Sequence, residues 1–125
     1  MGLGLHGGGL GVTRWLLKNG ARVTVTDLKK ENELKATLDA NVEFVLGEHR
    51  ASDFENADLI IRNPGVPRES RYLQIAREKN IRIRMELGLF TELLPRGMEQ
   101  VIGITGTKGK TTTTLMTGAI LKRAN

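Results

Sequence analysis

The sequence has 125 residues, of which 39% are hydrophobic and 26% are charged, and its formal net charge is +5. Length and composition are those of one ordinary globular domain, or of one domain with a piece of another. No apolar run approaches the roughly 20 residues of a membrane span, and no basic and apolar leader opens the chain. We therefore expect a cytoplasmic protein without a membrane partner.

The sequence has no cysteine. This excludes disulfides and thiolate chemistry. A zinc site would have to combine His6 and His49 with carboxylates, and the separation of these histidines argues against one.

Basic side chains are concentrated in residues 62–84, which contain seven Lys or Arg and only two Glu. Such a concentration can mark a surface for an anionic ligand, or it can be a solvated helix face. Aromatic residues make up only 4% of the chain, and Tyr72 is the single aromatic residue among these arginines. Because nucleic-acid surfaces usually offer stacking platforms, we expect no nucleic-acid partner.

The chain opens on glycines that fit the pattern G-x-G-x-x-G at Gly2, Gly4 and Gly7. A helix is predicted next, in which Val12, Trp15 and Leu16 share one face. A β-branched strand follows at residues 21–27 and ends in Asp27, 20 residues beyond Gly7. In a dinucleotide-binding βαβ unit, an acid at this spacing meets a ribose or base.

Only Met1 precedes the first glycine, so the hydrophobic strand that such a unit needs is missing. We expect either that the natural protein starts earlier or that its first strand is truncated. The sheet would then lack its central strand, and the neighbouring strands would lose pairing partners. The alternative is a flexible glycine-rich tail before a helix.

Alternating helices and strands continue along the chain. The pattern predicts a helix at 30–38, a strand at 42–45, a turn at 47–50, a short helical or turn segment at 53–57, a strand at 58–62, a helix at 70–79, a strand at 81–85 and a helix from residue 86. In the helix at 70–79, Leu73, Ile75 and Ala76 are expected to point inward. Strands separated by such helices indicate an α/β fold with a parallel, doubly wound sheet, whose ligand loops lie at the carboxyl ends of the strands.

The segment from Asn63 to Pro67 falls at such a carboxyl end. Pro64 and Pro67 stiffen it, and Gly65 permits a positive φ or a close approach of backbone to a ligand. A plain turn between strand and helix is the alternative. Further on, Pro95 and Gly97 interrupt regular secondary structure, and we predict a domain boundary after residue 97.

A phosphate-binding loop is predicted near the C-terminal end. Residues 101–105 have the pattern of a short buried strand, Gly106 to Thr111 form a glycine-rich turn, and residues 112–123 form a helix with an apolar face. Lys110 would reach the outer phosphates and the Thr111 hydroxyl would hold Mg²⁺. The strict pattern requires glycine where this chain has Ile104, and a lysine-rich surface turn is the alternative.

Three motifs in order, Gly2 to Gly7 with Asp27, Asn63 to Pro67, and Gly103 to Thr111, resemble the N-terminal part of the Mur ligases of peptidoglycan synthesis. The resemblance is strongest to the branch that adds D-glutamate. It covers essentially the whole chain, but only about the first quarter of such an enzyme. It implies a Rossmann-like domain at 1–97 that binds the UDP precursor, followed at 98–125 by the first strand, P-loop and helix of an ATPase domain.

The resemblance also implies an activity, which is ATP-dependent ligation of D-glutamate to UDP-N-acetylmuramoyl-L-alanine through an acyl phosphate, with Mg²⁺. The full-length enzyme would be a monomer, and the isolated chain is expected not to ligate. The implied UDP-substrate site comprises Gly4, Leu5, His6, Gly7, Asp27, Asn63, Pro64 and Gly65. The implied ATP site comprises Gly106, Thr107, Lys108, Gly109, Lys110, Thr111 and Thr112, with Lys110 catalytic and Thr111 on the metal.

Other interpretations remain open at this point. A nicotinamide-dinucleotide module of an oxidoreductase or regulator would explain the first glycines and Asp27, but it leaves the phosphate loop unexplained. An inactive nucleotide-binding remnant, or a cyanophycin- or folate-type ligase, is a further possibility. The chain departs from the Mur pattern in its missing first strand, in His6 and in the glycine run at 7–9, and it does not fix which amino acid is added.

Overall fold

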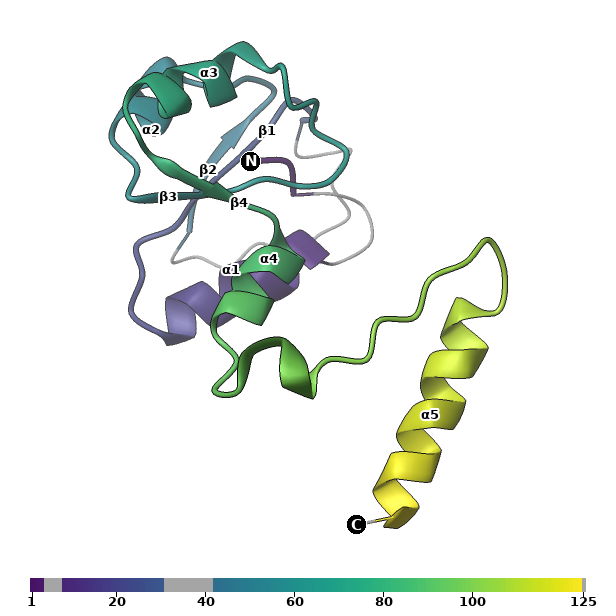
Figure 1. The fold of residues 1–125 in the computed structure, drawn as a ribbon. Coiled ribbons are helices and arrows are strands. Elements are labelled where there is room, and N and C mark those ends of the chain that lie inside the picture. The colour runs from purple at the N-terminus through teal and green to yellow at the C-terminus, as the bar shows by residue number, and fades with distance from the viewer. Residues whose placement is uncertain (4–7, 31–41, 125) are drawn as a thin grey trace. The chain divides into compact units, whose positions relative to one another are not determined.

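The computed structural model describes residues 1–3, 8–30 and 42–124. These form two compact units, Met1–Glu92 and Leu93–Asn125, which we call unit 1 and unit 2. Figure 1 shows strands covered by helices in unit 1 and a long helix, α5, in unit 2. The predicted α/β class with parallel strands is confirmed.

The elements of unit 1 follow the predicted alternation. In chain order they are α1 (Gly8–Lys18), β1 (Thr24–Asp27), β2 (Glu43–Leu46), α2 (Ala51–Glu55), β3 (Leu59–Ile61), α3 (Arg71–Glu78), β4 (Arg82–Arg84) and α4 (Glu86–Glu92). β1 pairs with β2 and β3 pairs with β4, both in parallel. The helix predicted at 30–38 falls almost entirely on residues 31–41, which lie outside the described residues.

A first hydrophobic cluster joins α1 to the β1–β2 pair. Its buried members are Leu3, Val25 and Val42. On α1, Leu10 and Leu17 pack against this cluster, and Thr13 between them is buried, which is the spacing of one helix face. Trp15, which is predicted to share a face with Val12 and Leu16, is 45% exposed. At 3.6 residues per turn it lies roughly 200° around the helix from Thr13.

A second cluster joins α2 and α3 to the β3–β4 pair. Its buried members are Phe54, Ile60, Leu73 and Ala76. Leu73 and Ala76 are three positions apart on α3 and so share one face, as predicted. The alternating apolar pattern of the sequence therefore locates this part of the core correctly.

The two strand pairs are joined by Met1 to Leu3 rather than by direct pairing of β1 with β3. The Gly2 N–H donates to the Thr26 carbonyl at 2.8 Å, and the Met1 nitrogen donates to the Ile61 carbonyl at 2.9 Å. This short segment therefore occupies, between the carboxyl ends of β1 and β3, the place of a central strand. The separation into two small sheets is what the loss of central pairing predicts.

Unit 2 contains a short 3₁₀ helix, η2 (Gly97–Gln100), and α5 (Lys110–Ala124). The strand predicted at 101–105 does not form, and Ile102 is 62% exposed. A strand needs a neighbour for its N–H and C=O groups, and the described part of unit 2 contains no other strand. The predicted helix is confirmed and begins two residues early.

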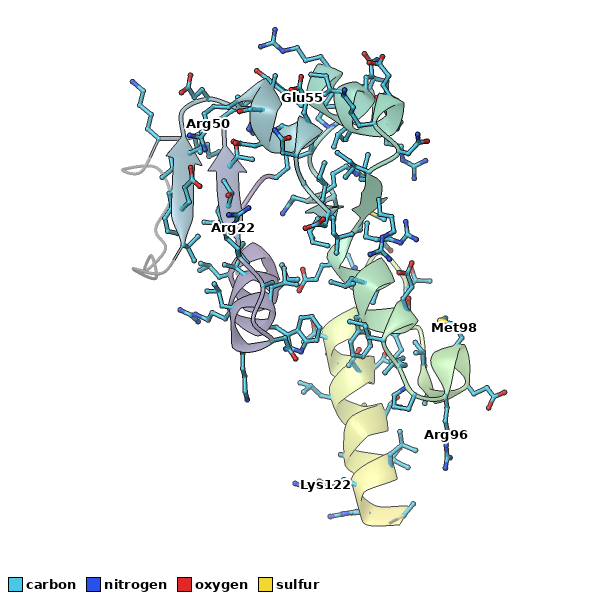
Figure 2. All side chains as sticks on the ribbon, turned by 90° about the vertical axis from the view of Figure 1, so that its left-hand side faces the viewer. Arg22, Arg50, Glu55, Arg96, Met98 and Lys122 are labelled. Carbon is cyan, nitrogen blue, oxygen red and sulfur yellow. The ribbon has the colours of Figure 1, made fainter. Side chains whose placement is uncertain are left out.

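The predicted apolar face of α5 is present but uncovered. No residue of α5 is buried, and Leu115 is 69% exposed. Figure 2 shows side chains extending from α5, with Lys122 labelled near its end. Among the described helices of both units, none is both long and apolar enough to cross a membrane.

Candidate functional site

Asp27 closes the carboxyl end of β1. Its side chain is buried, and its two oxygens accept from different backbone groups: Oδ2 from the Leu3 N–H at 2.7 Å and Oδ1 from the Lys29 N–H at 2.9 Å. A carboxylate oxygen has a second lone pair, so each can still accept from a ligand. Asp27 therefore holds Leu3, the residue just before the predicted glycine turn, in place.

The loop that begins at Asn63 is held by its own side chain. Asn63 Oδ1 accepts from the Gly65 N–H at 3.0 Å, and the Asn63 carbonyl accepts from the Val66 N–H at 3.0 Å. Such an Asx turn fixes a short loop without help from regular structure. The Asn63 N–H also donates to the Met1 carbonyl at 3.0 Å, so the loop is tied to the start of the chain.

Gly2 lies against this loop. Its φ is +73°, and a Cβ built on it would come within 2.8 Å of Val66 Cγ2 and 3.0 Å of Asn63 Cβ. Both the backbone conformation and the close approach therefore require glycine. The glycine pattern of the sequence included Gly2, but only the fold shows which loop it contacts.

Arg62 supports the same loop from inside the molecule. It is buried, its Nη1 donates to the Val66 carbonyl at 2.5 Å, and its Nη2 lies 3.1 Å from Met85 Sδ. The sequence placed Arg62 in a basic stretch and did not single it out. Its position at the end of a buried strand was the available signal.

Glu86 lies near the start of α1, which sequence analysis also missed. A Cβ built on Gly8 would come within 2.6 Å of Glu86 Oε2. Acidic groups are favourable at the positive end of a helix dipole. The same carboxylate would oppose an anionic ligand approaching that helix end, and nothing in the local sequence signals the contact.

His49 packs into the second cluster rather than standing free as a metal ligand. Thr26 Oγ1 lies 2.5 Å from His49 Nδ1, and the ring meets those of Tyr72 and Phe54 edge-on, at centroid distances of 5.1 and 5.8 Å. Burial, reinforced by the nearby Met1 ammonium, lowers the pKa of His49. Across residues 1–3, 8–30 and 42–124, no three His, Asp or Glu side chains are placed to hold a metal ion.

The second candidate site is the loop before α5. Gly106 and Gly109 have φ of +146° and +79°, which favour glycine. Lys110 Nζ donates to the Gly106 carbonyl at 2.6 Å, and the Thr113 N–H donates to the Gly109 carbonyl at 2.9 Å. The N–H groups of the first helical turn lack partners within the helix, and Thr111 is exposed beside them. These residues fit a phosphate group with a cation at the Thr111 hydroxyl.

The structure brings some predicted residues together. Asp27 and the loop at Asn63, Pro64 and Gly65 lie at one end of unit 1, connected through Met1 to Leu3. Gly4, Leu5, His6 and Gly7 lie outside the described residues. The seven residues predicted for ATP are contiguous in unit 2, and all are exposed.

Comparison with known proteins agrees with the motifs. Residues 1–85 match the family described as Mur ligase MurD-like, N-terminal domain. Relatives named UDP-N-acetylmuramoylalanine--D-glutamate ligase include that of Roseiflexus sp. (strain RS-1), 55% identical over 98% of this chain and 26% of its own length. Those of Geobacter metallireducens and Borreliella burgdorferi (strain ZS7) are 44% and 43% identical over 94% and 90% of this chain, and 26% and 25% of their own lengths.

The chain thus spans about a quarter of the length of these relatives. The family match alone covers both Asp27 and the Asn63 loop, and the likeness to the relatives extends through the phosphate loop. The chain belongs to the Mur ligase family, and its residues 1–85 are a MurD-like N-terminal domain of that family.

Proposed function

We propose that this chain is the precursor-binding and phosphate-loop part of an ATP-dependent ligase that adds D-glutamate to UDP-N-acetylmuramoyl-L-alanine. The observation that carries the proposal is the 55% identity to a relative of that name over 98% of the chain. It spans both candidate sites, so neither has to be explained separately. The domains would be 1–97 for the UDP precursor and 98–125 for the start of the ATP domain.

In the proposed precursor site, the turn at Gly4 to Gly7 approaches the diphosphate. Asp27 sits near the uracil while its existing bonds hold Leu3 and Lys29. The Asn63 loop lines the same site, and its rigidity supports this role, because a preorganised loop loses little entropy when a ligand binds. Leu5, His6, Pro64 and Gly65 complete the proposed lining.

In the proposed ATP site, Lys110 and the backbone from Gly106 to Thr112 hold the phosphates, and Thr111 holds Mg²⁺. ATP supplies the phosphoryl group that activates the precursor carboxylate as an acyl phosphate, and the D-glutamate amine then displaces phosphate. Lys110 is proposed as catalytic because a cation beside the transferred group offsets its developing charge. For this step Lys110 Nζ must leave the Gly106 carbonyl, to which it now donates. We propose a cytoplasmic enzyme that is monomeric at full length.

Calorimetric titration with UDP-N-acetylmuramoyl-L-alanine tests the precursor site. We expect binding that is weakened about tenfold by Asn63→Ala, because the Gly65 N–H loses its acceptor and the loop loosens. Asn19→Ala is the matched control, since Asn19 lies exposed after α1. Tight binding of NADH with no binding of the UDP precursor would instead favour the dinucleotide module.

Titration with ATP and Mg²⁺ tests the phosphate loop separately. Lys110→Ala should weaken binding roughly tenfold or more, because a charge-assisted contact is worth about 1.5–3 kcal/mol. Lys122→Ala, in the last turn of α5, should leave it unchanged. Equal effects of the two substitutions would indicate non-specific attraction to lysine and would count against the site.

A further inference from the structure

Met85 is the single residue between β4 and α4. It is 38% exposed, so solvent reaches this residue. Its sulfur also lies 3.1 Å from Nη2 of Arg62, which donates to it. Arg62 is itself buried, with only 8% of its surface exposed. Met85 therefore connects the surface of unit 1 to a charged group in its interior.

The guanidinium of Arg62 depends on this contact because its charge has few partners. Nη1 donates to the Val66 carbonyl and Nη2 donates to the Met85 sulfur, and both acceptors are neutral. Within residues 1–3, 8–30 and 42–124, no carboxylate forms an ion pair with Arg62. Loss of one acceptor would leave a buried charged donor without a partner, which is costly.

The other acceptor of Arg62 belongs to the Asn63 loop. The Val66 N–H donates to the Asn63 carbonyl at 3.0 Å, and Val66 Cγ2 is the atom nearest to a Cβ built on Gly2. Arg62 thus holds the residue through which this loop contacts the start of the chain. A displacement of the guanidinium should therefore loosen the hydrogen bonds of the loop.

The backbone leaves little freedom on either side of the contact. The Arg62 N–H donates to the Arg84 carbonyl at 2.7 Å, which fixes the end of β3 against β4. The Met85 carbonyl accepts from the Leu89 N–H at 3.0 Å, in the first turn of α4. A change in the size or polarity of the sulfur must therefore be absorbed by the two side chains.

Oxidation to the sulfoxide changes both size and polarity. A lone pair of the thioether sulfur attacks one oxygen of a peroxide, an S–O bond forms, the O–O bond breaks, and water or an alcohol leaves after proton transfer. Sulfur is oxidised by two electrons and the peroxide is reduced by two. The product is a polar side chain in place of an apolar one.

Neither epimer of the sulfoxide preserves the contact with Arg62. An oxygen directed at Nη2 does not fit, because an N–H···O bond alone spans about 2.9 Å and the sulfur is only 3.1 Å away. An oxygen directed at solvent leaves a sulfur with partial positive charge beside the guanidinium, and such a sulfur is a weaker acceptor. In both cases Arg62 must move or lose a partner.

We propose that Met85 is an oxidation site for peroxides, and that its sulfoxide loosens the Asn63 loop through Arg62. The change is reversible, because sulfoxide reductases return the sulfoxide to the thioether. The effect on the loop stands on the contacts within unit 1. Its consequence for precursor binding rests on the proposed function.

Treatment of the 125-residue chain with hydrogen peroxide, followed by peptide mass spectrometry and amide exchange, tests the site. Met85 should be oxidised under conditions that oxidise Met98, which is 64% exposed in unit 2. Exchange at the Gly65 and Val66 N–H groups should then become roughly tenfold faster, because their acceptors are on the loosened loop. Exchange at Leu73, in the second cluster, should stay unchanged.

Two variants locate the effect. Met85→Leu keeps an apolar side chain of similar size but forms no sulfoxide, so peroxide should leave its loop exchange as it was. Met98→Leu is the matched control and should respond as the unaltered chain does. A response that persists in Met85→Leu would overturn the proposal. So would an unchanged loop in a chain whose Met85 is oxidised, or a Met85 that resists peroxide while Met98 is oxidised.

Titration with UDP-N-acetylmuramoyl-L-alanine tests the consequence for binding. The oxidised chain should bind roughly tenfold more weakly than the untreated chain, because the loop is no longer preorganised. Treatment with methionine sulfoxide reductases should restore the affinity. If the untreated chain does not bind the precursor, the proposed function fails, while amide exchange still decides the role of Met85. Equal affinities before and after oxidation would contradict the link from the loop to the precursor.

Discussion

In unit 1 the ligand loops are held by contacts between residues far apart in the chain, such as Leu3 to Asp27 and Met1 to Asn63. In unit 2 the phosphate loop is held by contacts four residues apart, from Lys110 to Gly106 and from Thr113 to Gly109. Loop geometry that rests on local contacts can persist without a core. Loop geometry that rests on distant contacts should be lost when the core unfolds.

The same contrast holds for apolar burial. Unit 1 has two hydrophobic clusters, whereas α5 of unit 2 has no buried residue. Helical stability in proteins comes mostly from packing of an apolar face, so α5 by itself should be only marginally stable. Substitutions in the core should therefore change the stability of unit 1 and leave α5 unaffected. The following substitutions are ordered by expected effect.

A matched pair of leucines should give the largest difference. Leu73 of α3 is fully buried, whereas Leu115 of α5 is 69% exposed. Leu73→Ala should lower the unfolding free energy of unit 1 by about 4 kcal/mol, through lost burial and the cavity left behind. Leu115→Ala should change it by less than about 0.5 kcal/mol. Urea denaturation followed by Trp15 fluorescence measures both, and similar losses would contradict the comparison.

The second largest loss of stability is expected at Gly2, which lies between the two halves of unit 1. Gly2→Ala places a Cβ against Val66 and Asn63 at a positive φ, so it should cost about 3 kcal/mol. Gly11→Ala is the control, because nothing lies within 4 Å of its added Cβ and it sits inside α1. It should stabilise by about 0.5–1 kcal/mol. If both substitutions lowered Tm equally, the contact of Gly2 with the loop would not matter.

The pH dependence of unit 1 should follow its buried amine. Folding lowers the pKa of the Met1 amine from 8.0 to about 6 and also lowers that of His49. The unfolded chain therefore binds more protons in this range, and stability rises with pH. The Met1 contribution is complete above about pH 8 and is lost toward pH 6, by up to about 2.5 kcal/mol.

Denaturation curves at pH 6, 7 and 8 measure this slope. Acetylation of the Met1 amine removes its titration, so the N-terminally acetylated chain should retain only the dependence of His49. A slope of the opposite sign would show that the folded state binds the extra protons.

The smallest difference is expected between substitutions of two aspartates, one buried and one exposed. Asp27→Asn keeps one acceptor but places an amide group beside a backbone donor, so it should cost about 1.5 kcal/mol. Asp58→Asn, at an exposed position, should stay within about 0.5 kcal/mol. Phosphorus NMR of bound ATP should be unchanged in both, since the phosphate loop belongs to unit 2. A change in the phosphorus resonances of bound ATP in Asp27→Asn alone would show that the two sites are coupled.

Sequence reasoning succeeded where structure follows local pattern. The β-branched run before Asp27 and the apolar run at Leu59 gave the strands, and the spacing of Leu73 and Ala76 gave the buried face of α3. It did not show that Trp15 is exposed, because the orientation of α1 is set by what the helix packs against. It failed at residues 101–105 because a strand requires a neighbour, which no local pattern supplies.

The candidate sites show the same division. The motifs identified Asp27 and Asn63 as site residues, but not that Asp27 holds Leu3 or that Asn63 contacts Met1. Arg62 and Glu86 were missed because they contact residues far away in the chain, Met85 and Gly8, which are 23 and 78 positions distant. Contacts over long sequence separation cannot be derived from spacing within a single sequence.

Met1 and Leu3 lie two residues apart and belong to opposite hydrophobic clusters. The cooperativity of unit 1 should therefore depend on this short segment. With it in place, melting of either cluster strips packing and hydrogen bonds from the other, which favours a single all-or-none transition. With Met1 to Leu3 detached, the contact of Thr26 with His49 would be left to link the β1–β2 half to the β3–β4 half, and the transition should become less cooperative.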